Sequence, residues 1–180
     1  MPMPADALRA EAGFTLIELV VFIAVIGIAI GGVLLAVNQA SSRSADPLIQ
    51  IRAAELGQAY LDEILPKKYD QHTGNDGQTP RCGSSDPGSQ PCSATLGPES
   101  GETRARYDDV DDYNGLSDDP PLDAEGNARP GYAGYRADVS VAYAGSELPN
   151  LGNGDAKRIT VTITTPQGES FAFAAYRTNF

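Results

Sequence analysis

Acidic side chains are concentrated in one stretch of this 180-residue chain, and carboxylates at this density can bind cations or transfer protons. Residues 99–125 hold ten of the 24 acidic residues, and only Arg104 and Arg106 oppose them. Clustered carboxylates are hard oxygen ligands that suit Ca²⁺. The same pattern also fits a solvated acidic loop or paired-carboxylate catalysis, although no apolar pocket signal accompanies it. The candidate calcium ligands are Asp108, Asp109, Asp111 and Asp112.

Two cysteines and one histidine are further candidates for metal binding or catalysis. Cys82 and Cys92 enclose a loop rich in Gly, Ser and Pro, and the only histidine is His72. A zinc site needs about four Cys, His or carboxylate ligands, so we predict a disulfide between the cysteines instead. A disulfide indicates an oxidising compartment such as the periplasm. Without a plausible Ser-His-Asp or Cys-His arrangement, we predict that the chain is not an enzyme.

The charge balance and the distribution of apolar residues restrict the class further. The formal net charge is −11, which excludes nucleic acid as a partner because phosphate binding needs clustered Lys and Arg. The 24 residues Phe14–Val37 carry a single charge, Glu18. This run is long enough to cross a membrane as a helix and exceeds the roughly 7–15 apolar residues of a signal peptide. We therefore predict a retained transmembrane helix.

The orientation of that helix receives two opposing indications. Arg43 and Arg52 lie just beyond its C-terminal end, which would place the following domain in the cytoplasm by the positive-inside rule. The predicted disulfide instead favours the periplasm. We expect a single-pass inner-membrane protein with a periplasmic C-terminal domain.

A short motif precedes and enters the apolar helix. It reads Gly13-Phe14-Thr15-Leu16-Ile17-Glu18-Leu19-Val20-Val21. This resembles the class III signal of type IV pilins and of the related pseudopilins of type II secretion. The resemblance implies that residues 1–13 are a prepilin leader, that prepilin peptidase cleaves between Gly13 and Phe14, and that Phe14 is N-methylated. The leader here is slightly acidic, whereas leaders of the family are usually basic.

Glu18 has a physical reason to matter in such a helix. An ionisable group within a membrane span is costly, so it is by default a functional residue. Glu18 would lie about one helical turn from the new N-terminus, where its carboxylate can pair with the Phe14 amine of the same or the adjoining subunit. In the family, this pairing sets the register of subunits entering the filament.

The remaining segments predict a small folded domain. In residues 38–66, apolar residues recur at helical spacing from Leu48, and Pro66 ends the pattern. The pair Asp46-Pro47 is typical of a helix start, so we expect the helical spine to be kinked or broken between Gln39 and Pro47. Residues 67–130 show little periodicity and predict a disulfide-containing acidic loop region.

The last segment, residues 131–180, alternates apolar and polar residues around the turn Pro166-Gln167-Gly168, which indicates an antiparallel sheet. The predicted class is therefore α+β and type IV pilin-like. A long N-terminal helix, with a membrane half (14–37) and an amphipathic half, would pack on a small antiparallel β-sheet.

Two stretches narrow the resemblance. Ser44–Leu65 and Tyr107–Gly115 are similar to the corresponding stretches of a minor pilin of the mannose-sensitive haemagglutinin (MSHA) pilus. The resemblance implies a minor subunit that primes assembly or serves at the tip in adhesion, and that reaches the cell surface in the pilus. Its partners would be other major and minor pilins, prepilin peptidase, the inner-membrane assembly platform and the membrane, with no cofactor besides the calcium considered above. A minor pseudopilin of a type II secretion system is the alternative, because both classes share the N-terminal motif.

Overall fold

The computed structural model describes residues 15–74 and 80–180, and for residues 38–46 it describes the backbone alone. The predicted leader and the cleavage site between Gly13 and Phe14 lie outside the described residues. The chain divides into two compact units, Met1–Pro47 and Leu48–Phe180, and we describe each by itself. We call the second unit the head.

Helix α1 begins at Leu16 and ends at Ile64, so it contributes to both units. Its N-terminal stretch, Leu16–Val37, is long and apolar enough to cross a membrane. We expected a kink or a break between Gln39 and Pro47, and there is no break, because the helix includes Pro47. A proline removes only one backbone hydrogen bond of a helix, and the turns after Pro47 gain stability from their packing in the head. The helix ends just before Pro66, as predicted.

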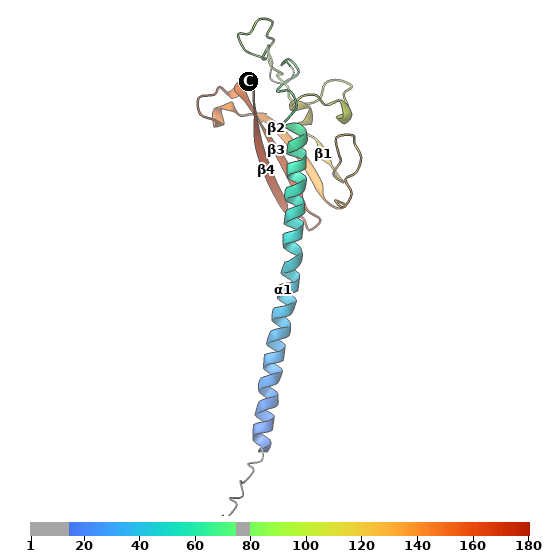
Figure 1. The fold of residues 1–180 in the computed structure, drawn as a ribbon, viewed down its shortest axis with the longest axis vertical. Helices are drawn as coiled ribbons and strands as arrows, with labels where there is room; N and C mark the ends of the chain where they lie inside the picture. The colour runs from blue at the N-terminus through green and yellow to red at the C-terminus, as the bar shows by residue number, and fades with distance from the viewer. Residues whose placement is uncertain (1–14, 75–79) are drawn as a thin grey trace, which may run out of the picture. The chain divides into compact units, whose positions relative to one another are not determined.

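The head contains one antiparallel sheet of four strands in the order β1-β2-β3-β4 (Figure 1). The strands are β1 (Ser117–Asp118), β2 (Arg136–Tyr143), β3 (Ala156–Thr164) and β4 (Ser170–Thr178). The turn between β3 and β4 is closed by Thr165 N–H, which donates to Glu169 O at 2.8 Å. Gly168 has a φ of 84° in this turn, a conformation that glycine adopts without strain. The predicted α+β class is confirmed, and the short strand β1 lies within the stretch where we expected only loops.

The core of the head forms where the C-terminal part of α1 lies along the sheet (Figure 1). Alternate residues of the strands face the helix, which explains their period of two. Gly57 allows close approach, since a Cβ there would lie 2.3 Å from Cδ2 of Phe173 on β4. The most buried apolar residues are Ala53, Leu56, Tyr60 and Ile64 of the helix, Ala137, Val139 and Val141 of β2, and Ile159, Val161 and Ile163 of β3.

A largely buried guanidinium fastens the long loop region to the helix. Arg104, in the 3₁₀ turn η2 (Arg104–Arg106), donates from Nη1 to Asp118 Oδ2 at 2.6 Å and from Nη2 to Glu63 Oε1 at 3.2 Å. The Tyr60 hydroxyl also donates to Asp118 Oδ2, at 2.6 Å, and Arg104 stacks over the Tyr60 ring. These contacts join α1, the loop and β1, so the region without sequence periodicity is ordered by polar contacts rather than by repeated elements.

Candidate functional site

The first turn of α1 is capped by a side chain that the motif already contains. Thr15 Oγ1 accepts the backbone N–H of Glu18 at 3.3 Å, and Thr15 O accepts the N–H of Leu19 at 3.2 Å. Thr15 is thus the N-cap, and Glu18 stands at the third helical position, the spacing of a capping box. This role of Thr15 was not predicted, although the Thr-x-x-Glu spacing of the sequence could have revealed it.

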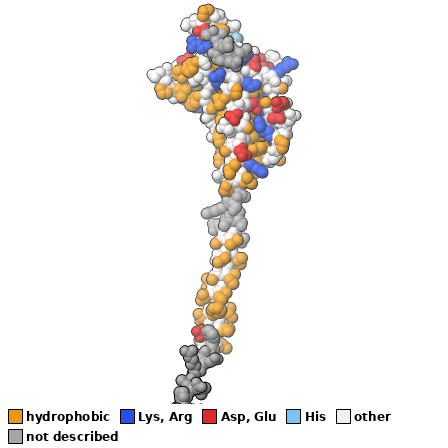
Figure 2. Space-filling view, viewed as in Figure 1, with side chains coloured by type: hydrophobic (Ala, Val, Ile, Leu, Met, Phe, Trp, Pro, Cys, Tyr) orange, Lys and Arg blue, Asp and Glu red, His pale blue; other side chains and the backbone are white. Residues whose placement is uncertain are grey.

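Beyond this cap, exposed apolar side chains follow one another along the helix from Leu16 to Val37, and Figure 2 shows one face of this surface. Leu16 is 83% exposed, Ile28 is 77% exposed and Leu35 is 72% exposed. A helix that is hydrophobic all round is normally buried in lipid or among other helices. The Leu16–Val37 stretch therefore needs a membrane or neighbouring subunits around it.

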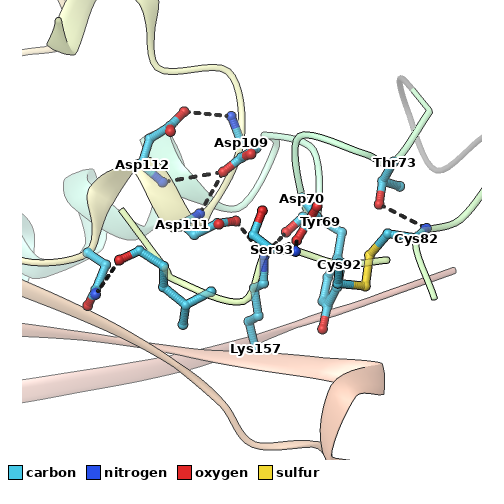
Figure 3. Close-up of polar contacts among 12 residues, drawn as sticks. Tyr69, Asp70, Thr73, Cys82, Cys92, Ser93, Asp109, Asp111, Asp112 and Lys157 are labelled. Atoms are coloured by element: carbon cyan, nitrogen blue, oxygen red, sulfur yellow. Dashed lines mark hydrogen bonds and ion pairs between the residues drawn. A yellow bond between two sulfur atoms is a disulfide. The ribbon is translucent and has the colours of Figure 1, made fainter. Parts of the chain in front are cut away.

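A lysine lies fully buried in the head. Lys157 of β3 donates from Nζ to Tyr69 O at 2.7 Å, to Asp70 Oδ2 at 3.1 Å and to Asp111 Oδ1 (Figure 3). Its ammonium also lies 4.6 Å from the centroid of the Tyr69 ring. All three ammonium protons therefore have acceptors, which is what a buried lysine requires. The burial of Lys157 was not predicted, because one lysine at the start of a strand pattern gives no signal of burial.

Asp70 forms an ion pair with Lys157. Burial by itself would raise the pKa of Asp70, but the Lys157 charge and the N–H groups of Ser93 and His72 hold that pKa below its ordinary value. Ser93 N–H donates to Oδ2 at 2.8 Å and His72 N–H donates to Oδ1 at 3.0 Å. The His72 side chain is 41% exposed, with Nδ1 3.5 Å from Asp70 Oδ1. The hydrogen bonds to Asp70 therefore hold the backbone at His72 and Ser93 in place.

The predicted calcium ligands do not all point to one place. Asp111 faces Lys157, whereas Asp109 and Asp112 turn inward around the 3₁₀ turn η3 (Asp111–Tyr113) (Figure 3). Burial, with Asp111 and Asp112 close by, raises the pKa of Asp109 to about 9. Burial likewise raises the pKa of Asp112. Asp108 is half-buried and pairs with Lys68, Nζ to Oδ2 at 2.7 Å.

Two glutamates that the sequence analysis did not select lie beside this turn. One carboxylate oxygen each of Glu99, Asp109 and Asp112 lies within 4.8 Å of the others, and the same holds for Glu102, Asp108 and Asp112. Partial burial and a contact with Glu102 raise the pKa of Glu99 to about 7. Acidic spacing alone could not identify them, because Glu99 and Glu102 are separated from the aspartates by the turn η2.

The predicted disulfide between Cys82 and Cys92 is present. Cys82 is buried, and its N–H donates to Thr73 Oγ1 at 3.4 Å. Asn179, near the C-terminus, donates from Nδ2 to Cys82 O at 2.9 Å. The disulfide therefore closes the loop at residues 82–92, and the Asn179 contact connects this loop to the end of β4.

Comparison with known families bears on the N-terminal unit. Residues 8–34 match the family model described as the prokaryotic N-terminal methylation motif. This match supports a type IV pilin-like prepilin. The matched range contains Gly13, Phe14 and Glu18 and extends into the apolar part of α1. No curated protein and no solved structure matches the chain.

The prepilin motif and the apolar helix together indicate membrane anchoring. The motif is that of structural subunits which assemble with other pilins after processing by prepilin peptidase. It is common to type IV pili and type II secretion pseudopili.

Proposed function

We propose that the chain is a minor pilin of an MSHA-type type IV pilus, processed by prepilin peptidase and incorporated to prime assembly or to act at the tip in adhesion. The observation that carries this proposal is the methylation motif at residues 8–34. It stands at the start of an apolar helix that can span a membrane, and a separately packed head follows that helix. In this role the C-terminal head is periplasmic before assembly and reaches the cell surface in the filament.

Three residues of the motif have specific roles in the proposal. Cleavage after Gly13 makes Phe14 the methylated N-terminus. Thr15 caps the helix immediately behind it, so the helical turn that carries Glu18 begins next to the new amine. The Glu18 carboxylate is then close enough to a Phe14 amine, its own or a neighbour's, to fix subunit register.

The pilus is preferred because of two stretches of the chain, most of whose residues belong to the head. Ser44–Leu65 and Tyr107–Gly115 are similar to stretches of the MSHA minor pilin MshD. In the structure, residues of both stretches meet, since the Tyr113 hydroxyl donates to Glu63 Oε1 at 3.1 Å.

A minor pseudopilin of a type II secretion system is the second candidate. The methylation motif favours it equally, because the same N-terminal helix builds both kinds of filament. The two functions differ in where the processed chain is found and in what its loss abolishes, and the experiment below uses both differences.

The test is mass spectrometry of filaments sheared from cells that express the full chain. We expect a peptide that begins at N-methylated Phe14, together with peptides of the head. Glu18→Ala should be processed but should be depleted from filaments by at least about tenfold, because the register interaction is lost. Glu55→Ala removes an exposed carboxylate from the same helix, within the head, and should assemble like the wild type.

Other outcomes decide against the proposal. Processed protein confined to the envelope, with intact pili but defective secretion in a deletion strain, would establish the pseudopilin. A mature chain that retains residues 1–13 would overturn both candidates.

A further inference from the structure

The acidic turn of the head contains buried carboxylate oxygens without partners. Among the described residues, Asp109 Oδ2 and Asp112 Oδ1 have no hydrogen-bond donor, although the exposed fractions of these residues are 0% and 1%. Leaving a buried carboxylate oxygen without a partner is unfavourable because it has lost its water. These oxygens therefore call for a proton or a cation, and no described side chain supplies one.

The other oxygen of each aspartate is already occupied, and this fixes the side chains in place. Asp109 Oδ1 accepts the N–H groups of Asp111 at 2.8 Å and of Asp112 at 3.3 Å. Asp112 Oδ2 accepts the N–H groups of Asp108 at 2.9 Å and of Asp109 at 3.1 Å. The backbone of the turn thus orients both carboxylates, so the free oxygens are preorganised.

The neighbouring cations of the head are engaged elsewhere. Lys157 is shared by Asp70 and Asp111, and Arg104 by Glu63 and Asp118. Lys68 reaches only Oδ2 of Asp108, and Oδ1 of that residue is again buried without a partner. The carboxylates around the turn therefore outnumber the cations that contact them.

The carboxylates form two groups that share Asp112, and the spacing within each group suits a hard cation. Asp112 belongs to both groups of oxygens that lie within 4.8 Å of one another, one with Glu99 and Asp109 and the other with Glu102 and Asp108. Calcium–oxygen distances of about 2.3–2.6 Å allow ligand oxygens on opposite sides of the ion to be up to about 5 Å apart. Glu99 is exposed and Glu102 half-buried, so an ion has access from solvent.

We propose that Glu99, Glu102, Asp108, Asp109 and Asp112 form a Ca²⁺ site, which differs from the predicted set by excluding Asp111 and including both glutamates. Calcium accepts six to eight oxygens in variable geometry, so these carboxylates and water can complete its shell. The ion would join the loop at residues 99–102 to η3, whose Tyr113 is buried in the core. Calcium binding would thereby stabilise the loop region of the head.

The test is calorimetric titration of the full chain in detergent micelles with CaCl₂ after removal of bound metal with EDTA. We expect one Ca²⁺ per chain and a higher melting temperature of the head in millimolar calcium. The double variant Glu99→Gln/Glu102→Gln, whose altered side chains lie outside the core, should lose at least about tenfold in affinity. Asp112→Asn should lose as much or more. Glu125→Gln, an exposed change in the same acidic stretch, should bind like the wild type.

Two results would overturn the site. One is the absence of calcium binding at millimolar concentration by a wild-type chain with a cooperative melting transition. The other is undiminished affinity in the folded double variant, which would show that calcium binds elsewhere. Neither result bears on filament assembly, so the calcium site and the proposed function are tested separately.

Discussion

Lys157 Nζ and Asp70 Oδ2 lie 3.1 Å apart, and both side chains are completely buried. Asp111 approaches the same ammonium from another loop, so one lysine of β3 holds two loop segments by their carboxylates. Breaking a buried ion pair by removing one partner leaves an uncompensated charge, which is far more damaging than losing a surface pair. Lys157 thus connects β3 to the two loop segments that carry Asp70 and Asp111.

Replacing Lys157 with methionine should therefore destabilise the head severely. We expect Lys157→Met to lower its free energy of unfolding by about 3–5 kcal/mol, because Asp70 and Asp111 lose their shared cation. Denaturant unfolding followed by near-ultraviolet circular dichroism of the tyrosines measures this. Lys68→Met removes the partly exposed pair with Asp108 and should change stability by at most about 1 kcal/mol. Equal effects of the two variants would refute the central role of Lys157.

Gly57 should be intolerant of a side chain, despite its position inside a helix. Alanine normally stabilises a helix by about 1 kcal/mol relative to glycine. The new Cβ would lie 2.3 Å from Cδ2 of the Phe173 ring, and such overpacking destabilises by about 1–3 kcal/mol. We expect a net loss of stability in Gly57→Ala, measured by thermal melting.

Two further variants test this explanation. Phe173→Leu should partly rescue Gly57→Ala, because the smaller side chain can move away from the helix. Gly154→Ala is the matched control, since no atom lies within 4 Å of its would-be Cβ and its φ is not positive. A Gly57→Ala head as stable as the wild type would mean that Phe173 repacks freely.

The parts of the fold that follow from periodicity could be predicted from the sequence. Period-two alternation at Ile159, Val161 and Ile163 indicated β3, and all three residues are buried. The helical spacing of Leu56, Tyr60 and Ile64 likewise indicated the buried face of α1. Both patterns are local, because burying one face of a regular element repeats along the chain.

The polar contacts of the head could not be predicted in this way. Lys157 and Asp70 are 87 positions apart, and a single charge in a strand pattern reads as a solvent-facing residue. The absence of a break at Pro47 has a related reason. The local preference of proline against helix is outweighed by the packing of the turns that follow, which the sequence does not display. Contacts between residues far apart in the sequence therefore determine both the burial of Lys157 and the continuity of the helix at Pro47.

The disulfide should contribute measurably to the stability of the head. Cys82 and Cys92 are ten positions apart, and closing a loop of this size is worth about 2–3 kcal/mol in the chain-entropy model. We expect Cys82→Ala/Cys92→Ala to unfold at lower denaturant by this amount. Reduction with dithiothreitol should destabilise the wild type similarly and leave the double variant unchanged. A wild type indifferent to reduction would show that the contacts of Cys82 with Thr73 and Asn179 suffice.

Asp109 should make the calcium-free head less stable as the pH rises. Its pKa is raised to about 9 in the folded head, mainly by burial, whereas an aspartate in an unfolded chain titrates near pH 4. Between these values the folded state binds more protons than the unfolded state, so the free energy of unfolding falls with increasing pH. The slope from this group is at most about 1.4 kcal/mol per pH unit.

Asp109→Asn isolates this effect. The amide keeps an oxygen for the N–H groups of Asp111 and Asp112 but has no carboxyl proton to lose. In EDTA, from about pH 5 to about pH 8, we expect denaturant unfolding to give a flatter profile for this variant than for the wild type. Glu125→Gln, an exposed change of the same charge, should retain the wild-type slope. A variant that follows the wild-type profile would show that Asp109 is ionised in the folded head across this pH range.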